Sequence, residues 1–268
     1  MALTDFQRGI LRLLSLSRLD GGDSYIAGGL ALNYHLKTSR YSRDIDIFHD
    51  SLKALETSWS SDCRILREAG YNVESRRQFP TFIEAVASKD GMATEIQWAH
   101  DSAYRFFPLL HDELMGLTLH PFDLATNKLL ALVGRVEPRD WIDIINCDRI
   151  LQPLPYLIWA ACGKDPGFNP SSLVEMIARR RYTQVELDSE FLENKFDAAT
   201  LCASWHELIR GARKTLPLLP PEHAGTCVTT ASGDLFKGTD DALQAALAAG
   251  AVRFHEGRIG GAWPTILR

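Results

Sequence analysis

The spacing of hydrophobic residues changes three times within the first fifty positions of the chain. In "LTDFQRGILRLL" apolar residues recur every three to four positions, which predicts a helix that begins at Thr4 or Asp5 and ends near "LDGGD". "SYIA" is predicted as a short strand that runs into the glycine pair of "AGGL", and "LALNYHL" as a helix that starts at those glycines. In "SRDIDIF" charged and branched apolar residues alternate, which is typical of a strand with one buried face.

The following segments continue this mixed pattern and then become helical. A helix is predicted over residues 52–69, closed by Gly70, and the turn "KDG" joins two strand-like runs, "TFIEAVAS" and "MATEIQWA", as a hairpin. Over residues 121–213 the period is mostly helical, and Pro138 and Pro170 stand where helices begin.

These patterns predict an α+β protein in three parts. Residues 1–120 form a core with a mixed sheet and helices, residues 121–213 a helical domain, and residues 214–268 a small α+β subdomain after "LPLLPPEHAG". In this last part "TCVTTASGDLFKG", "DDALQAALAAG" and "AVRFHEGRIGGAWPTI" predict a hairpin, a helix and a second hairpin.

Composition and charge narrow the class of protein. The 268 residues are 46% hydrophobic and 24% charged, which is ordinary for a globular protein, and the net charge of −5 means that a nucleic acid would have to meet a local basic patch. Five cysteines without a CxxC pair argue against a disulfide framework or a zinc site and favour a reducing cytoplasm. Because no apolar run approaches the roughly 20 residues that span a bilayer, we expect no membrane association.

The stretch from the glycine pair to "RDIDIF" carries the candidate chemistry. On a strand, Asp44 and Asp46 point to the same side while Ile45 and Ile47 face the core. Two carboxylates offer the oxygen ligands that Mg²⁺ prefers, with substrate phosphates and water completing its shell. Glycines at a helix start let a phosphate approach the unpaired N–H groups. A DxD strand alone is typical of a solvated face, and a glycine pair alone of a turn, but together they predict a site for a metal-bound triphosphate.

This combination resembles the signature of the DNA polymerase β-type nucleotidyltransferase superfamily. With "GGLAL", "RYSRDIDIF" and "DLATNKLLALVGRVEPRDWIDII" in this order, the sequence is similar to the AbiEii/AbiGii-type nucleotidyltransferases, known mainly as toxins of toxin–antitoxin and phage-defence systems. The resemblance implies a polymerase β-like nucleotidyltransferase core and transfer of a nucleotide from an NTP to an acceptor.

The same resemblance implies roles for individual residues. It places phosphate contacts at Gly28 and Gly29, Mg²⁺ or Mn²⁺ binding at Asp44 and Asp46, the triphosphate at Lys128, and the acidic end of the "RDxxD" pattern at Asp143. Leu30 departs from the pattern because many members have Ser or Thr there. The missing hydroxyl leaves phosphate binding to the backbone alone.

The neighbours of Lys128 on its predicted helix face are apolar, so a charged side chain at this position requires an explanation. A packed stem with the ammonium in water is the structural alternative to phosphate binding. Arg135, seven residues on, lies on the same face and is a second candidate for the phosphates. Asp143 has an alternative role in an intrahelical ion pair with Arg139, and Asp140 one as a favourable first-turn acid.

Three further positions complete the predicted site. Polymerase β-type sites take a third carboxylate from a neighbouring strand, and "ATEIQWA" offers Glu95 with Gln97 on the same face. If the register places Gln97 beside the aspartate pair, the usual base is absent. Arg40 and Ser42 belong to a pattern shared with the family, and the Ser42 hydroxyl is placed to orient Asp44 or a phosphate.

We therefore expect a cytoplasmic, Mg²⁺-dependent nucleotidyltransferase that uses two-metal phosphoryl transfer from an NTP. An RNA 3′ end, tRNA foremost, is the favoured acceptor, chosen by a cleft between the core and the helical segment, and a cognate antitoxin is the expected protein partner. "RGARK" and "IARRRY" are local basic runs, although such runs are more often solvated helix ends. The alternatives are a non-catalytic regulator that binds a nucleotide or protein on the same fold, and an antibiotic-modifying adenylyltransferase.

Overall fold

The computed structural model describes residues 3–191 and 196–266 and separates them into two compact units. Unit 1 contains the described residues up to Ala103 together with Pro108–Leu124. Unit 2 contains Tyr104–Phe107 and the described residues from Ala125 onward. Each unit has its own secondary structure and core, and each is described by itself.

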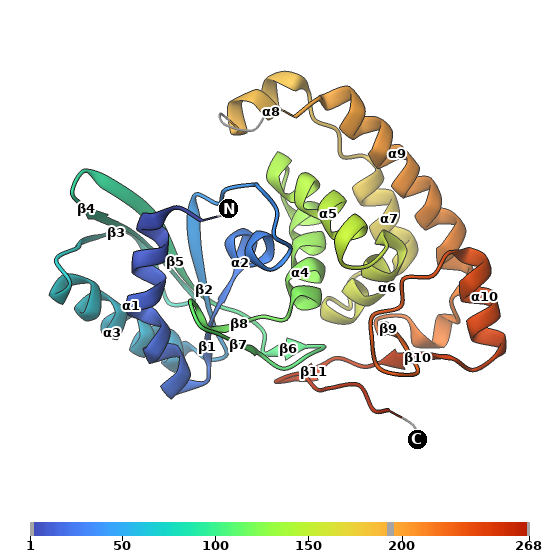
Figure 1. Cartoon of the computed structure of the whole chain (residues 1–268), viewed down its shortest axis with the longest axis horizontal. Helices are drawn as coiled ribbons and strands as arrows, with labels where there is room; N and C mark the ends of the chain where they lie inside the picture. Colours follow the sequence, from blue (N-terminus) through green and yellow to red (C-terminus); the bar gives the residue numbers. More distant parts are fainter. Residues whose placement is uncertain (1–2, 192–195, 267–268) are drawn as a thin grey trace. The chain divides into compact units, whose positions relative to one another are not determined.

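Unit 1 is built on a seven-stranded mixed sheet with the strand order β3-β4-β5-β2-β1-β8-β7 (Figure 1). β2 runs parallel to β5 and β1 parallel to β8, while the other neighbours are antiparallel. The mixed sheet and its helices confirm the predicted fold class. The strands are β1 (Ser24–Ala27), β2 (Asp44–His49), β3 (Asn72–Phe79), β4 (Phe82–Lys89), β5 (Met92–His100), β7 (Leu110–Asp112) and β8 (Gly116–Thr118).

Three helices of unit 1 begin where the sequence signals predict. α1 (Asp5–Gly21) opens with a capping box in which the Thr4 side chain accepts from the backbone of Gln7 and the Gln7 side chain accepts from the backbone of Thr4. α2 (Gly28–His35) starts at the glycine pair, and α3 (Leu52–Glu68) follows a serine cap.

α1 and α3 lie beside each other and cover one face of the sheet (Figure 1). Trp98 of β5 donates its indole N–H to Asp62 of α3 at 2.8 Å, and Asp62 forms a buried ion pair with Arg18 of α1. Because side chains alternate along a strand, every second residue of β2 and β5 points to the face that α1 and α3 do not cover. The fully buried residues of the covered face include Ile45, Ile47, Ile96 and Trp98.

β4 and β5 form the predicted hairpin, whereas β3 is a strand that the sequence does not predict. Asp90 and Gly91, both at positive φ, make the two-residue turn between paired Lys89 and Met92. Among the described strands β3 pairs only with β4, at the edge of the sheet, and Val73 is its one buried residue. With both faces exposed, this strand has no hydrophobic alternation for sequence analysis to detect.

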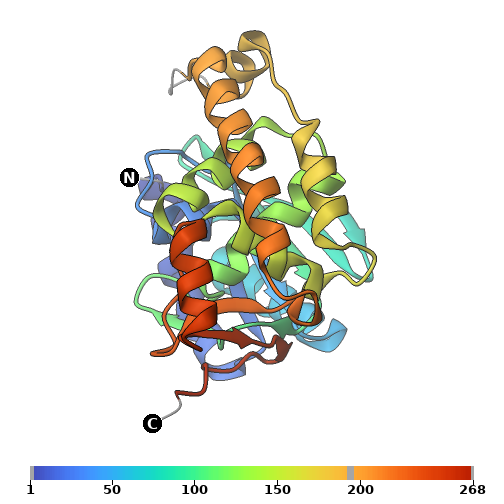
Figure 2. The same ribbon diagram turned by 90° about the vertical axis from the view of Figure 1, so that its right-hand side faces the viewer.

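Unit 2 consists of helices with a small C-terminal β structure. Pro138 and Pro170 are the first residues of α5 and α7, as predicted. α9 packs along α6 and α7 (Figure 2). The helices are α4 (Pro121–Gly134), of which unit 2 holds the part from Ala125, α5 (Pro138–Ile150), α6 (Leu154–Lys164), α7 (Pro170–Ala178), α8 (Gln184–Glu190), α9 (Ala198–Thr215) and α10 (Asp240–Ala248), with 3₁₀ turns η1 (Leu216–Leu218) and η2 (Pro221–His223).

One hydrophobic core joins these helices to the C-terminal strands. Trp141 of α5 and Trp205 of α9 meet edge to face with ring centroids 6.0 Å apart, and Val228 and Val252 of the strands are buried in the same cluster. The division into residues 121–213 and 214–268 stays a prediction.

The two hairpins predicted near the C-terminus are wrong in their pairing. β9 (Cys227–Thr230) pairs with β10 (Val252–His255) across the intervening α10, and β11 (Arg258–Ile259) pairs with β6 (Tyr104–Arg105). The first run makes only a single bridge from Thr229 to Leu235 within itself. Turn residues in the sequence signal a reversal, but they do not show which distant strand accepts the hydrogen bonds.

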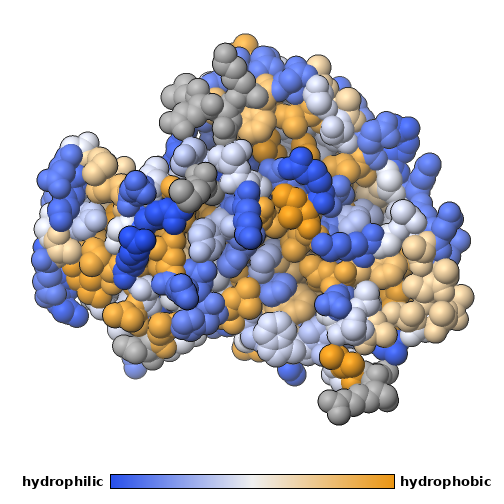
Figure 3. Space-filling model, in the orientation of Figure 1, coloured by the Kyte–Doolittle hydropathy of each residue, from blue (hydrophilic) through white to orange (hydrophobic). Residues whose placement is uncertain are grey.

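The helices, the cysteines and one face of the surface bear on the expectations drawn from composition. No helix in the described parts of the chain is long and apolar enough to cross a membrane. All five cysteines are free. On the face shown in Figure 3, hydrophilic and hydrophobic residues are interspersed.

Candidate active site

The turn from β1 into α2 is shaped around Asp46. Gly28 adopts a φ of +66°, and a Cβ atom built on it would overlap with the carboxylate of Asp46. The β1–β2 register explains this approach, because Asp46 is the partner of Ala27, the residue just before the helix. Ala27 caps the helix without a side-chain hydrogen bond. The Asp46 carboxylate therefore lies against the positive end of α2, where only glycine leaves it room.

Asp44 and Asp46 lie on the face of the sheet opposite α1 and α3. Both are half-buried, and the isoleucines beside them are completely buried on the other face. The buried Ser42 donates its hydroxyl to Oδ1 of Asp44 at 2.8 Å, which fixes the orientation of this carboxylate. Two neighbouring carboxylates are thus presented on one side of β2.

The parallel strand β5 adds Glu95 and Gln97 to the same face. The register pairs Asp44 with Glu95 and Asp46 with Gln97. Gln97 donates to Oε1 of Glu95 at 2.6 Å. Glu95 is therefore a third carboxylate next to the aspartate pair, while an amide stands opposite Asp46.

The carboxylates of this site are the candidate ligands for the Mg²⁺ or Mn²⁺ that the sequence implies. Among the residues that the structure describes, no group of three or more His, Cys, Asp or Glu side chains is arranged to hold a metal. Asp44 and Asp46 nevertheless supply the one or two carboxylates that Mg²⁺ ordinarily takes from a protein when a substrate triphosphate and water provide the rest. The two carboxylates fit a metal that arrives with its nucleotide.

α2 offers backbone groups rather than a side-chain hydroxyl for phosphate. Leu30 is completely buried in the core of unit 1, so this departure from the family pattern serves packing. Asn33, also buried, donates to the carbonyl of Gly29 at 2.7 Å and accepts from Thr38. Arg40 is buried in the loop before β2 and donates to the Tyr41 carbonyl at 3.0 Å.

Unit 2 contains a second group of predicted residues, joined in a buried ionic cluster. The Lys128 ammonium lies 2.8 Å from Oδ1 of Asp140 and 3.4 Å from Oδ2 of Asp143. Arg135 contacts the other oxygen of Asp140 at 2.7 Å. The Lys128 side chain is only 6% exposed, so the alternative of an ammonium in water is wrong. Arg135 differs because its side chain is 46% exposed.

Asp140 is the centre of this cluster, although the sequence favours a simple role for it in the first turn of α5. Its carboxylate is completely buried. Burial would raise the pKa of Asp140, but the nearby Lys128 charge and the Arg135 hydrogen bond outweigh burial and lower it. Arg139, proposed as a partner for Asp143, forms an ion pair with Glu137 at 2.5 Å. In the sequence, the two basic residues Lys128 and Arg135 on one face of the helix are the signal that could have indicated a shared acidic partner.

The structure thus assembles the predicted residues in two groups. Unit 1 brings together the residues of the β1–α2 turn, β2 and β5, and unit 2 brings together the residues of α4 and α5. The first group is Gly28, Gly29, Arg40, Ser42, Asp44, Asp46 and Glu95, and the second is Lys128, Arg135 and Asp143, to which the structure adds Asp140.

Comparison with protein families gives a match that covers all of these residues. The model described as "Nucleotidyl transferase AbiEii toxin, Type IV TA system" matches residues 13–152, which is 140 of the 268 residues. No curated protein matches the sequence at a significant level.

Comparison with solved structures identifies similar folds. A Helicobacter pylori protein assigned as a nucleotidyltransferase has a TM-score of 0.54 and 14% identity, over 81% of this chain and 99% of that one. JHP933, also from Helicobacter pylori, has a TM-score of 0.51 and 16% identity, over 81% of this chain and 95% of that one. At these identities the similarity concerns the fold.

Proposed function

The chain belongs to the nucleotidyl transferase AbiEii toxin family of type IV toxin–antitoxin systems, and we propose that it transfers a nucleoside monophosphate from an NTP to an acceptor hydroxyl, releasing pyrophosphate. The observation that carries the proposal is the close approach of Asp46 to Gly28 at the start of α2. This contact puts carboxylates suited to a metal beside backbone N–H groups suited to phosphate. We propose an RNA 3′ end, tRNA foremost, as the acceptor, on the basis of the family resemblance.

Each predicted site residue of unit 1 has a defined task in this proposal. Asp44 and Asp46 would hold Mg²⁺ or Mn²⁺, which when bound neutralises triphosphate charge and makes the acceptor hydroxyl easier to deprotonate. The Ser42 hydroxyl keeps Asp44 in a single orientation. The N–H groups of Gly28 and Gly29 donate to the β- and γ-phosphates, and Arg40 supports the loop that leads into β2.

Glu95 is the proposed acceptor of the hydroxyl proton. It stands opposite Asp44, and the hydrogen bond from Gln97 holds one of its oxygens in place. Within the described residues the other oxygen has no hydrogen bond. A fixed carboxylate with one available oxygen is suited to take a proton from a nearby hydroxyl.

The residues of unit 2 supply charge for the triphosphate in this proposal. The family motif assigns this task to Lys128, and the half-exposed guanidinium of Arg135 is a second cation that a phosphate can reach. Asp143 and Asp140 hold the Lys128 ammonium in position. A phosphate that binds Lys128 must therefore compete with two carboxylates, and one that binds Arg135 must compete with Asp140, although the Arg135 side chain is more exposed.

The cellular setting follows from the same proposal. NTPs and tRNA are cytoplasmic, so we propose that the protein acts in the cytoplasm and that a cognate antitoxin counteracts it. Leu30 supports the competing proposal of a non-catalytic nucleotide-binding regulator, because its buried side chain offers no phosphate contact.

Incubation with each α-labelled NTP, Mg²⁺ and separated RNA, protein and small-molecule fractions tests the proposal. We expect label on RNA 3′ ends with the wild-type protein and none with Asp44→Asn combined with Asp46→Asn. Asp188→Asn, on an exposed position of α8, is the matched control and should transfer label normally. If label appears only on protein or on a small molecule, that class of molecule is the acceptor and the proposal of RNA is wrong. Bound nucleotide without label in any fraction would favour the regulator.

A further inference from the structure

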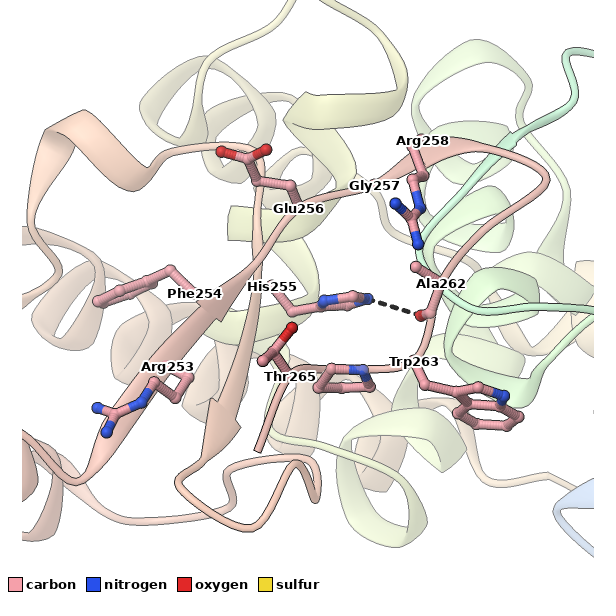
Figure 4. Close-up of a pocket in the computed structure, with 10 residues that line it drawn as sticks. Arg253, Phe254, His255, Glu256, Gly257, Arg258, Ala262, Trp263 and Thr265 are labelled. Atoms are coloured by element: carbon pink, nitrogen blue, oxygen red, sulfur yellow. Dashed lines mark hydrogen bonds between the residues drawn. The ribbon is translucent and has the colours of Figure 1, made fainter. Parts of the chain in front are cut away.

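A pocket of about 390 Å³ opens in unit 2 between β10 and the C-terminal residues that follow β11 (Figure 4). Its walls come from residues 253–258 on one side and residues 262–265 on the other. The volume falls in the range of roughly 300–1,000 Å³ that is typical of ligand sites. None of these residues belongs to the candidate active site.

The charge of this pocket differs from that of the whole chain. Arg253 and Arg258 line it with a single acidic residue, Glu256, although the chain carries a net charge of −5. Within the described residues neither arginine has an acidic partner, and both donate to backbone carbonyls. Figure 4 shows Glu256 and Arg253 pointing away from His255 and Trp263, whereas Arg258 extends toward Ala262. Arg258, without a carboxylate partner, is therefore the cation of this pocket that is placed to meet an anionic group near Trp263.

An exposed aromatic ring lies at the edge of the same pocket. Trp263 is 62% exposed, whereas the other five tryptophans of the chain are buried or half-buried. Its indole lies 6.3 Å from the ring of the buried Phe107, which limits its movement. A large aromatic face held at the surface beside cationic groups is the arrangement on which unpaired bases stack.

The pocket is built before any ligand arrives. His255 donates from Nε2 to the carbonyl of Phe106 at 2.8 Å and to that of Ala262 at 2.9 Å, because both partners can only accept. The second bond joins the two walls of the pocket (Figure 4). Gly257 approaches the Tyr104 ring so closely that a Cβ atom would overlap with it. A prearranged site has less entropy to lose when it binds a ligand.

We infer that this pocket binds a single-stranded segment of nucleic acid, with a base on Trp263 and a phosphate at Arg258. The inference rests on the proposed function, because it supplies the RNA acceptor with a binding site outside the residues that react. Stacking on one ring and cationic contacts to phosphates give affinity without reading a sequence. An acidic protein segment could pair with the arginines, but it would make no use of the exposed aromatic face of Trp263.

Binding of a 5′-labelled, single-stranded 12-mer RNA, followed by fluorescence anisotropy, tests this inference. We expect Trp263→Ala to weaken binding about tenfold and Trp263→Phe to keep it within about twofold. Arg258→Ala should lower the slope of log K against log salt by about 0.7, the value for one lost phosphate contact on a single strand. Ile259→Ala, 73% exposed in the same segment, is the control and should bind as wild type. Unchanged affinity in both Trp263→Ala and Arg258→Ala would overturn the inference.

Two further measurements separate this inference from the proposed function. Unlabelled RNA should quench the tryptophan emission of the wild type, and this quenching should disappear in Trp263→Phe although the RNA still binds. In the transfer assay Trp263→Ala should raise the KM for RNA and leave the rate at saturating RNA unchanged. If the KM for RNA is the same in Trp263→Ala and the wild type, the pocket does not bind the RNA acceptor, and the proposed nucleotidyltransferase activity still stands. If RNA binding depends on Trp263 but no nucleotide is transferred, the pocket binds RNA and the proposed nucleotidyltransferase activity is wrong.

Discussion

Gly28→Ala probes the contact on which the candidate site depends. Gly28 combines a positive φ with direct contact to the Asp46 carboxylate, so alanine changes both the backbone and the site. The backbone term is about 1–2 kcal/mol, the cost of a left-handed conformation for a residue with a Cβ. The added methyl also overlaps with Asp46, so the carboxylate must shift. A shift of roughly 1 Å at a reacting centre lowers the rate by about 100-fold.

Gly22→Ala is the matched control for this variant. Gly22 ends α1 at a φ of +74°, and nothing lies within 4 Å of the position where its Cβ would be. It therefore carries the same backbone cost without the contact. Urea unfolding should show a loss of about 1–2 kcal/mol in Gly22→Ala and at least as large a loss in Gly28→Ala, while incorporation of labelled NMP should fall only in Gly28→Ala. Equal incorporation by the two alanine variants would refute the reasoning.

Three further predictions follow from the buried polar and apolar groups. Leu30→Ser should lower the free energy of unfolding by about 3 kcal/mol in urea and leave NTP affinity unchanged, because this side chain is core; tighter NTP binding would contradict this. Lys128→Met should lower the free energy of unfolding by about 3 kcal/mol, because it leaves Asp143 and part of Asp140 buried without their cation. Calorimetry should show a larger loss of affinity for NTP than for NMP, because the Lys128 charge acts on the outer phosphates, and equal losses would make Lys128 purely structural. Burial lowers the pKa of His49 to about 4 from an unfolded value near 6.5, so this group stabilises the fold above pH 6.5 and loses its contribution as the pH falls toward 4. His49→Gln should flatten the urea stability curve over that interval, and an unchanged curve would exclude this role.

The parts of the fold that the sequence predicts are those with a local signal. The capping residue Thr4, the two-residue turn before Met92, and the helix-starting prolines each act within a few positions. Alternation in "RDIDIF" predicts which face Asp44 and Asp46 occupy because burial of the isoleucines on the other side enforces it.

The parts that the sequence does not predict depend on distant partners. β3 is exposed on both faces, so its pairing with β4 comes from backbone hydrogen bonds that leave no pattern in the side chains. β11 pairs with β6, far away in the chain. Asp140 resembles an ordinary first-turn acid until α4 and α5 pack and bring Lys128 and Arg135 to it.

Pyrophosphate release measured alongside incorporation of α-labelled NMP tests the central claim most directly. The wild-type protein should release one pyrophosphate for each nucleotide that it attaches to RNA. Asp44→Asn combined with Asp46→Asn should do neither while unfolding at the same or a higher urea concentration, because removing two neighbouring like charges relieves repulsion. Transfer by the double variant at the wild-type rate would contradict the assignment of this carboxylate pair as the catalytic centre.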